Sequence, residues 1–311
     1  MLERAQVAEH TKTQFIIVNN LMAQFVRLVL LSQVRGGTRL TLFLAHRLRP
    51  LQSVELRLPG GGTLYADLRI ITTHALMRNR FWEAGEMAVM RHLIEPNDTI
   101  FDVGAHIGTH TVAFSQWVGG GGRVISFEPQ PNILPALRLT IQTLNNTLLQ
   151  TYALSDQTGK AQFYVPDDHA MAGLADWTQG TRGKVRQIEC QTHCLDQQMI
   201  AQNWPQPDVI KCDVEGAEYH VFRGACQTLN RPDAPILLFE SNRSVFSFGL
   251  TRDAALTFLR HLKHAQFTFF QVEPNGTILP IKAPLTQHVN VLAVPKAKMH
   301  RIEALIPVTD G

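Results

Sequence analysis

The segment Thr99-Ile-Phe-Asp102-Val-Gly104-Ala-His106-Ile-Gly108 decides the fold, because it joins an apolar strand pattern to a glycine-containing loop. Helical spacing follows directly over residues 108–117. Glycine lets the backbone turn tightly and approach a ligand without a Cβ atom in the way. The start of the next helix offers amide groups and the positive end of a helix dipole. The segment therefore predicts the first turn of a cofactor-binding βαβ unit.

Strand and helix patterns alternate from Asp98 onward, which predicts an α/β fold with a mostly parallel sheet and ligands at the carboxyl ends of its strands. Only the short segment Pro274–Pro284 joins the last two strands, so the last strand should be antiparallel. The expected fold is a seven-stranded Rossmann-like sheet. The seven predicted strands are residues 99–103, 123–127, 148–154, 208–213, 235–240, 266–272 and 289–294. The predicted helices between them are residues 108–117, 131–144, 216–229 and 251–263.

The N-terminal part of the chain lies outside this alternation. Helical spacing covers residues 5–31 and 40–49, with Gly36-Gly37 as the break between them. Alternating apolar and polar residues on both sides of Gly60-Gly61-Gly62 predict a β-hairpin. The predicted division is a basic helical extension at 1–50, a β-hairpin with its flanks at 51–80 and the α/β domain at 81–311.

The charge of the chain is unevenly distributed. There are 29 Lys and Arg residues against 26 Asp and Glu residues, a net charge of +3. Residues 1–50 carry a net charge of +5 and the rest of the chain carries −2. A nearly neutral body argues against a surface that follows nucleic-acid phosphates. The basic extension is expected to form a homo-oligomer interface or a lid over the acceptor site, with peripheral membrane contact left open.

The sequence gives no sign of membrane insertion or export. The apolar stretch 15–31 is interrupted by Asn19, Asn20, Gln24 and Arg27, whereas a membrane span needs about 20 apolar residues. No signal-peptide pattern is present, and the four cysteines lack the spacing of a zinc site. These features predict a cytoplasmic protein with reduced thiols.

Glu128 ends the second predicted strand, where an acid is placed to accept hydrogen bonds from ribose hydroxyls. The loop glycines, Gly104 and Gly108, are four residues apart, and His106 stands where a pyrophosphate would approach the backbone. This spacing disfavours a dinucleotide. S-adenosylmethionine has no phosphates, and Asp102 is placed to face its ammonium group. The alternative interpretation is an ordinary βα turn with an acid nearby.

Six stretches of the chain together resemble the FkbM family of S-adenosylmethionine-dependent methyltransferases, over roughly Leu51–Pro295. The stretches are FDVGAHIGTHTVAFS (101–115), VISFEPQPN (124–132), ALSDQTGKAQFYV (153–165), CLDQ (194–197), VIKCDVEGAEYHVFRGA (209–225) and ILLFESN (236–242). The resemblance implies a class I methyltransferase fold, S-adenosylhomocysteine as a product and O-methylation of a small-molecule hydroxyl, often on a sugar, glycoside or secondary metabolite. His106 replaces the family's usual asparagine.

The resemblance also implies roles for individual residues. Asp102 and the loop would line the methionyl end of the cofactor, Glu128 the ribose, and Ser155-Asp156 the adenine edge. The segment Asp156-Gln-Thr-Gly159 is equally the pattern of a plain β-turn. The residues expected to bind the cofactor are Asp102, Gly104, His106, Gly108, Glu128, Pro129, Ser155, Asp156 and Asp213.

Methyl transfer to a hydroxyl needs alignment and removal of a proton. The fourth strand ends in three carboxylates, and strand alternation sends Asp213 and Glu215 to the same side. The expected catalytic residues are Asp213, Glu215 and His106. Glu215 and Glu218 are alternatively simple acids at a helix N-terminus. Magnesium, with Glu240 as an added ligand, is left open, and no metal ligand is predicted.

The loop over residues 166–183 interrupts the regular pattern and is expected either to be an acceptor lid or to be a surface excursion.

Two alternative functions stay open. A methyltransferase-fold binding module without turnover would have lost Asp102, Glu128 or Asp213, and all three are present. An NAD-dependent oxidoreductase would need the dinucleotide glycine pattern, which this chain lacks.

Overall fold

The computed structural model describes residues 17–18, 21–48, 51–58, 61–78, 83–167, 169–181 and 183–306. The chain forms two compact units, Met1–Trp82 and Glu83–Gly311, called here the N-terminal and C-terminal units. Among the helices of these described residues, none is long and apolar enough to cross a bilayer.

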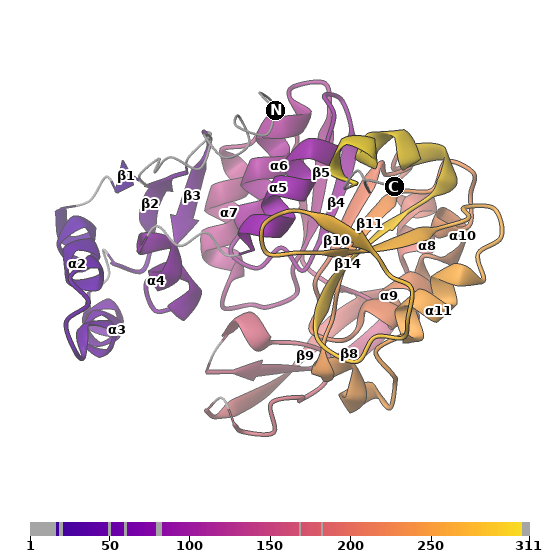
Figure 1. Cartoon of the computed structure of the whole chain (residues 1–311). Coiled ribbons are helices and arrows are strands. Elements are labelled where there is room, and N and C mark those ends of the chain that lie inside the picture. The colour runs from indigo at the N-terminus through magenta and orange to yellow at the C-terminus, as the bar shows by residue number, and fades with distance from the viewer. Residues whose placement is uncertain are drawn as a thin grey trace. The chain divides into compact units, whose positions relative to one another are not determined.

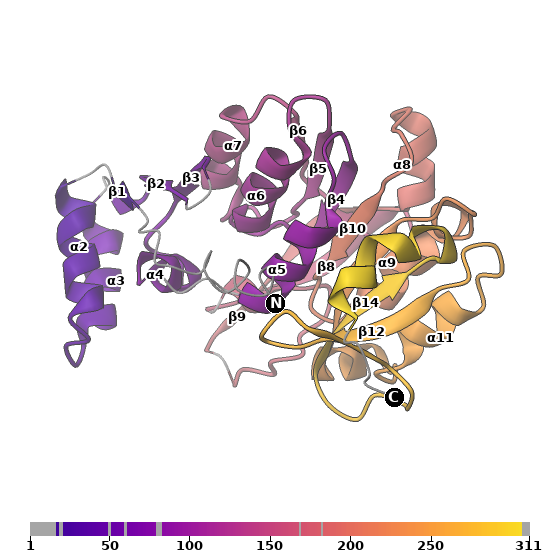
Figure 2. The ribbon, with the colours of Figure 1, turned by 45° about the horizontal axis from the view of Figure 1, so that its top comes forward.

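The N-terminal unit contains two neighbouring helices, α2 (Leu21–Leu31) and α3 (Gly37–Arg47), and a small antiparallel sheet (Figure 2). The strands are β1 (Ile17–Val18), β2 (Val54–Arg57) and β3 (Thr63–Ala66). The predicted hairpin is confirmed as β2 and β3. The helix predicted over 5–31 is wrong at residues 17–18, which form β1 against β2, and its first part lies outside the described residues.

A further helix, α4 (Ile71–Met77), follows the hairpin, and the sequence patterns did not predict it. Directly after α4, the Arg78 guanidinium donates to the Thr38 hydroxyl at 2.6 Å and to the Leu30 carbonyl at 3.3 Å. These bonds tie the end of α4 to both α2 and α3. Alternate residues of the hairpin, Val54 and Leu56 among them, are fully buried on its inner face.

The C-terminal unit is built on an eight-stranded sheet in the order β13-β12-β14-β11-β10-β4-β5-β6. Figure 1 labels β4, β5, β10, β11 and β14 of this sheet. The strand β14 is antiparallel to both neighbours, which confirms the expected reversal of the last strand. The expected count of seven is one short, because the three residues of β13 form an edge strand beside β12. The bounds are β4 (Thr99–Val103), β5 (Arg123–Phe127), β6 (Thr147–Gln150), β10 (Val209–Cys212), β11 (Ile236–Ser241), β12 (Thr268–Val272), β13 (Ile278–Pro280) and β14 (Val289–Val294).

Helices cover both faces of this sheet. Because strand side chains alternate between faces, Ile100 joins a core with α5 and α6, whereas Phe101 joins a core with α9 and α11. Helix α7 (Leu134–Gln142) links β5 to β6. The bounds are α5 (Ala84–Leu93), α6 (Thr109–Val118), α8 (Leu195–Ala201), α9 (Glu218–Gly224), α10 (Cys226–Leu229) and α11 (Ala254–Arg260). Two 3-10 segments, η3 (Arg243–Phe248) and η4 (Lys296–Leu305), complete the unit.

A second, three-stranded sheet lies in the same unit, in the order β7-β9-β8. Its strands are β7 (Ala153–Leu154), β8 (Gly159–Pro166) and β9 (Val185–His193). The strand predicted over 148–154 is therefore wrong as one element, because residues 147–150 pair with β5 and residues 153–154 pair with β9. The loop between β8 and β9 contains the short helix η2 (His169–Met171).

Candidate active site

The candidate site forms where strands β4, β5, β10 and β11 end. The register pairs Cys212 with Val103 on one side and with Phe239 on the other. The residues at or just after these strand ends therefore meet at one edge of the sheet: the loop from Gly104, Glu128, Asp213 and, within the last residues of β11, Glu240. Parallel strands place their carboxyl ends together, so the predicted location of the site follows from the observed topology.

Gly104 is required by backbone packing. Its φ is +85°, and a Cβ atom there would lie 1.9 Å from the carbonyl oxygen of Asp213. The Asp213 amide in turn donates to the Val103 carbonyl at 2.9 Å. Only glycine fits a position of this conformation and closeness. Gly108, with φ of +89°, is the residue before α6 and starts that helix.

Asp102 is fully buried at the end of β4. The Thr111 hydroxyl, from α6, donates to Asp102 Oδ2 at 2.6 Å, and Thr111 also lies 2.9 Å from the Ser126 hydroxyl. The other oxygen, Oδ1, is buried and has no hydrogen-bond partner among the described residues. Burial raises the pKa of Asp102 above its usual range. An unpartnered buried carboxylate oxygen suits a cationic donor such as the ammonium of S-adenosylmethionine.

Glu128 is buried, and both of its carboxylate oxygens already accept a backbone hydrogen bond. Oε2 accepts from the His106 amide and Oε1 from the Gln130 amide, each at 2.8 Å. Each oxygen keeps a second lone pair that a ribose hydroxyl could use. Burial raises the pKa of Glu128 to about 7. Pro129 follows Glu128 and is partly exposed.

His106 lies in the loop with a left-handed φ of +49°. Burial lowers the pKa of His106 to about 4, with Asp213 opposing that shift and His169 adding to it. The imidazole is therefore neutral at neutral pH, and a group with so low a pKa is a weak proton acceptor. His106 Nε2 and Gln130 Nε2 are both buried without a hydrogen-bond partner in the described part of the chain. With Asp102 Oδ1, they give the loop a polar lining that fits the cofactor.

Ser155 and Asp156 lie after β7 and contact helix α9. Asp156 Oδ2 lies 3.3 Å from Arg223 Nη1 and 3.4 Å from His220 Nδ1. The Ser155 hydroxyl donates to Asp156 Oδ1 at 3.4 Å. A Cβ on Gly224 would lie 2.0 Å from the Ser155 carbonyl oxygen. These contacts join the turn to α9, and the role of Asp156 at an adenine edge stays a prediction.

Three carboxylates converge at the ends of β10 and β11. Carboxylate oxygens of Asp213, Glu215 and Glu240 all lie within 4.8 Å of one another. The side chains of Asp213 and Glu240 keep 30% and 20% of their surface exposed, so a small molecule can reach them. Glu215 has a left-handed φ of +55°, a conformation that an L-residue rarely adopts. This trio of carboxylates is the feature of the site with the clearest chemistry.

Two carboxylates of this trio have side-chain partners. Lys211 Nζ donates to Asp213 Oδ2 at 3.0 Å. His288 Nε2 lies 2.7 Å from Glu240 Oε1, and this hydrogen bond raises the pKa of His288. The Asn242 amide donates to the other oxygen of Glu240. Asp213 and Glu240 thus stay close together because each has its own partner.

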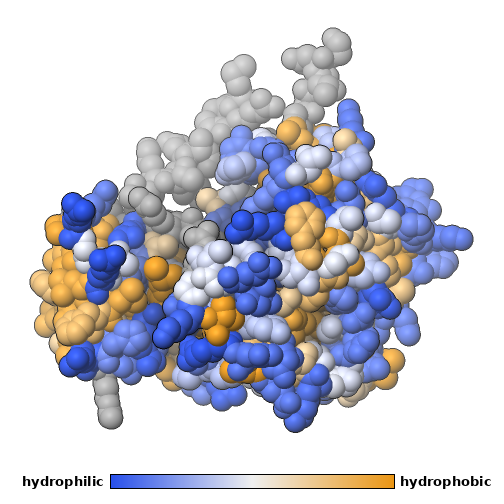
Figure 3. Space-filling model, turned by 90° about the horizontal axis from the view of Figure 1, so that it is seen from below, coloured by the Kyte–Doolittle hydropathy of each residue, from blue (hydrophilic) through white to orange (hydrophobic). Residues whose placement is uncertain are grey.

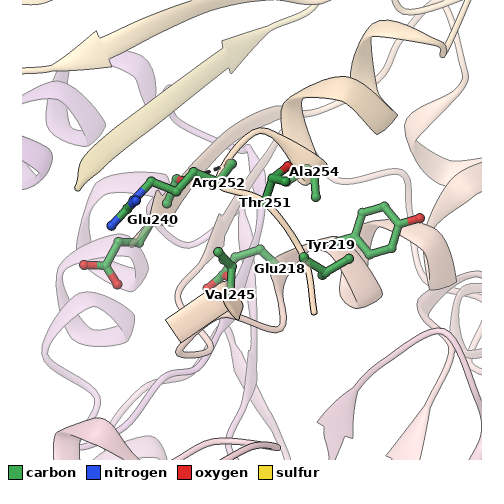
Figure 4. Close-up of a pocket in the computed structure, with 10 residues that line it drawn as sticks. Glu218, Tyr219, Glu240, Val245, Thr251, Arg252 and Ala254 are labelled. Atoms are coloured by element: carbon green, nitrogen blue, oxygen red, sulfur yellow. Dashed lines mark hydrogen bonds between the residues drawn. The ribbon is translucent and has the colours of Figure 1, made fainter. Parts of the chain in front are cut away.

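Glu218 has a structural environment. Its Oε1 accepts from the Val214 amide at 3.1 Å and from the Gly216 amide at 3.3 Å, so it closes the turn into α9. Burial raises the pKa of Glu218 to about 8. Glu218 and Glu240 line the same small pocket, with Tyr219, Val245 and Arg252 (Figure 4). The turn into α9 is therefore held by a protonated carboxyl group at neutral pH.

A second group of charged side chains, not found from the sequence, lies behind Lys211. Burial alone would lower the pKa of Lys211, but Asp213, Glu83 and Asp102 raise it above the usual value. Burial raises the pKa of Glu83 to about 8. Glu86 accepts a hydrogen bond from the Asn290 side chain on β14. Glu83 directly precedes α5 and Glu86 lies in its first turn. No sequence motif marks either residue.

His288 was also missed, although its position carried a signal. It directly precedes β14, the strand that runs opposite to the others. The start of an antiparallel strand lies at the edge where its parallel neighbours end. His288 is thereby brought to Glu240, 48 residues earlier in the chain.

The loop between β8 and β9 reaches the strand ends. A Cβ on Gly173 would lie 3.3 Å from Glu215 Cβ. The Arg243 guanidinium lies 5.3 Å from the centre of the Trp177 ring, and the Trp177 indole nitrogen is buried without a partner among the described residues. The loop thus lies beside the carboxylate trio, and its role as a lid stays a prediction.

The strand order, the reversed β14 and the glycine loop after β4 define a class I, Rossmann-like methyltransferase fold. The chain belongs to the FkbM methyltransferase family, whose domain matches residues 102–269, more than half of the chain. This confirms the resemblance seen in the sequence.

Comparison with individual proteins gives distant relatives. The hexuronic acid methyltransferase AglP of Haloferax volcanii is 30% identical over 149 residues, which cover 47% of this chain and 58% of that protein. A SAM-dependent O-methyltransferase from Thermotoga maritima is 11% identical with a TM-score of 0.37, over 77% of this chain and 76% of that one. The precorrin-6y C5,15-methyltransferase from Geobacter metallireducens is 12% identical with a TM-score of 0.36, over 69% and 89%.

Proposed function

We propose that this protein is an enzyme that transfers the methyl group of S-adenosylmethionine to a hydroxyl group of a small-molecule acceptor. The observation that carries the proposal is the trio Asp213, Glu215 and Glu240, with oxygens within 4.8 Å of one another beside the glycine loop. In a methyltransferase domain, carboxylates at this place are suited to orient and deprotonate an acceptor.

The cofactor would lie along the ends of β4 and β5. When bound, it supplies a methyl group on a positively charged sulfur atom. Asp102 Oδ1, which is buried without a partner among the described residues, would face its ammonium group. Glu128 would accept hydrogen bonds from its ribose hydroxyls. The neutral His106 ring would line the methionyl end without adding a charge that repels the sulfonium.

The acceptor would approach the exposed side of the trio. One carboxylate would take the hydroxyl proton as the acceptor oxygen bonds to the methyl carbon and the methyl–sulfur bond breaks, with S-adenosylhomocysteine as the leaving group. A second carboxylate would accept a hydrogen bond that fixes the acceptor's orientation. Lys211 holds the Asp213 carboxylate in place through the 3.0 Å hydrogen bond. His288 does the same for Glu240. The reaction therefore needs no proton acceptor other than these side chains.

The charge of the trio bears on the acceptor's chemistry. Three carboxylates favour a neutral hydroxyl and repel an acceptor that would receive the methyl group on its own carboxylate. The relative from Haloferax volcanii is named for a hexuronic acid, a sugar that carries both kinds of group. A sugar hydroxyl is thus the acceptor class that we favour, and a hexuronic acid would be methylated on oxygen away from its carboxylate.

The test is direct transfer to matched acceptors. The purified protein is incubated with S-adenosylmethionine and with glucuronic acid, glucuronic acid methyl ester or glucose, each as a simple glycoside, and products are identified by mass spectrometry and NMR. The proposal expects a product heavier by one CH2 unit that resists mild alkali, as an ether does. With glucuronic acid as the acceptor, a new methyl group that mild alkali removes would be an ester, and would overturn the choice of a hydroxyl acceptor.

A further inference from the structure

We propose that the outer face of α2 and α3 is a docking surface for an anionic lipid bilayer. This surface, called here the apolar-basic face, belongs to the N-terminal unit, and the inference does not depend on the proposed reaction. The proposed occupant of this face is a membrane whose surface carries acidic lipid headgroups.

Large apolar side chains are exposed along both helices. Leu21 is 84% exposed, Phe25 55%, Leu28 65%, Val34 62% and Phe43 56%. Figure 3 shows apolar side chains gathered on the face that these helices form. On a globular protein, a contiguous exposed apolar patch of this kind marks a surface that contacts a partner or a membrane.

Packing among the described residues of the unit does not account for these side chains. The inward face of α2 is already formed by Ala23, Val26 and Leu30, which are buried. Thr41 and Ala45 do the same for α3. A surface helix of a globular protein has one apolar face, which packs on the core, and a polar opposite face. A second apolar face therefore indicates that something else covers it.

The charge of the segment favours an anionic partner. Residues 21–48 contain no Asp or Glu, but they contain Arg27, Arg35, Arg39 and Arg47. Arg35, Arg39 and Arg47 are exposed. The Arg47 guanidinium lies 5.2 Å from the centre of the Phe43 ring, so cation and aromatic side chain are presented together. Acidic headgroups complement this arrangement, and interfacial helices combine apolar and basic residues in the same way.

The same charge disfavours a second copy of the chain as the occupant. A symmetric dimer through this face would bring two acid-free, arginine-rich segments together without a compensating charge. Each helix has 11 residues, which gives a length of about 16 Å. That length is well below the ~30 Å of a hydrocarbon core, so the helices would lie in the interface.

The experiment uses the full-length protein and co-sedimentation with vesicles. Vesicles of phosphatidylcholine alone are compared with vesicles that also contain phosphatidylglycerol, at low and high salt. The expected result is binding to the anionic vesicles only, with weaker binding at high salt. Equal binding to both vesicles, or binding to neither, would overturn the proposal.

Variants assign the binding to this face. Leu28→Glu with Phe43→Glu should abolish sedimentation with anionic vesicles. Arg35→Gln with Arg39→Gln and Arg47→Gln should weaken binding by roughly 100-fold, since each basic residue near the lipid surface adds about a factor of five. Ile200→Glu is the matched control, because Ile200 is 76% exposed on α8 in the other unit. It should bind as the wild type does.

Two further measurements keep the outcome unambiguous. Circular dichroism melting of each variant shows whether the N-terminal unit stays folded. Light scattering measures the mass of the wild type without lipid. A wild-type dimer that Leu28→Glu with Phe43→Glu converts to a monomer, together with no vesicle binding, would make the face a self-association surface and would refute the lipid proposal.

Discussion

The backbones of Gly104 and Asp213 are in close contact in the site: a Cβ on Gly104 would lie 1.9 Å from the Asp213 carbonyl oxygen. The glycine loop after β4 and the carboxylates after β10 are therefore positioned by one backbone contact. A shift of either strand end must move the other. This contact links the two halves of the proposed reaction and can be tested by substitution.

We expect Gly104→Ala to destabilise the C-terminal unit by about 3 kcal/mol and to lower turnover, since both the left-handed φ and the close contact resist a side chain. Gly249→Ala is the matched control. Gly249 has a φ of +69° with nothing within 4 Å of the position of a Cβ, so it should cost only about 1 kcal/mol. Chemical unfolding measures both. Equal costs would show that the contact with Asp213 is not what requires glycine.

Asp213→Asn should lower turnover by at least about 100-fold while affinity for the cofactor changes little. The asparagine keeps the shape of the side chain but loses the negative charge that accepts a proton and pairs with Lys211. Steady-state kinetics and calorimetric titration of the cofactor give the two quantities. Asp176→Asn, in the loop between β8 and β9, provides a control for charge removal. A variant with wild-type turnover would remove Asp213 from the reaction.

Affinity for S-adenosylmethionine should depend on pH through Glu128, whose pKa burial raises to about 7. Below this pH the protonated group has less capacity to accept ribose hydroxyls, so affinity should rise as pH increases from about 6 to about 8. Glu128→Gln should bind roughly 10-fold more weakly at pH 8, without that rise. Glu189→Gln, at an exposed acid on β9, should behave as the wild type. An unchanged pH profile in Glu128→Gln would contradict the ribose assignment.

The local patterns of the sequence predicted much of this arrangement. The strand, the glycine loop and the acid after β5 lie within 30 residues, so their spacing alone indicated a cofactor turn. Lys211 and Asp213 stand two residues apart, so strand alternation puts them on one face, where they form an ion pair. Each of these relations is set by backbone geometry over a short stretch of chain.

The features that were missed depend on residues far apart in the chain. His288 meets Glu240 only because β14 is antiparallel, and Glu83 reaches the surroundings of Lys211 only because α5 packs on the sheet. The short edge strand β13 ends in Pro280, which weakens a strand pattern. The interruption between β6 and β7 likewise depends on pairing with β9, which begins 31 residues after β7 ends.

Glu218 should make stability depend on pH. Burial raises its pKa from about 4.5 to about 8, so the folded state favours the protonated form. The stabilisation is complete below about pH 4.5 and is lost as pH rises to about 8. We expect Glu218→Gln to lose less stability than the wild type between pH 5 and pH 8, by about 3–4 kcal/mol. Urea unfolding across this range measures the difference, and parallel curves would show that Glu218 is ionised in the folded protein.

Removal of divalent metal should leave turnover largely intact. Asp213, Glu215 and Glu240 could hold a magnesium ion, since their oxygens lie within 4.8 Å of one another. Lys211 forms an ion pair with Asp213 and His288 pairs with Glu240, so two of the three carboxylates already have a partner, which lowers the affinity of the trio for a dication. We therefore expect activity after dialysis against EDTA to stay within about twofold of the untreated enzyme, with or without added Mg²⁺. If EDTA abolished activity and Mg²⁺ restored it, the trio would instead be a metal site. In that case Lys211→Gln should need a lower Mg²⁺ concentration for activity. Asp233→Asn is the control, because Asp233 lies outside the trio and pairs with Arg231 on the surface.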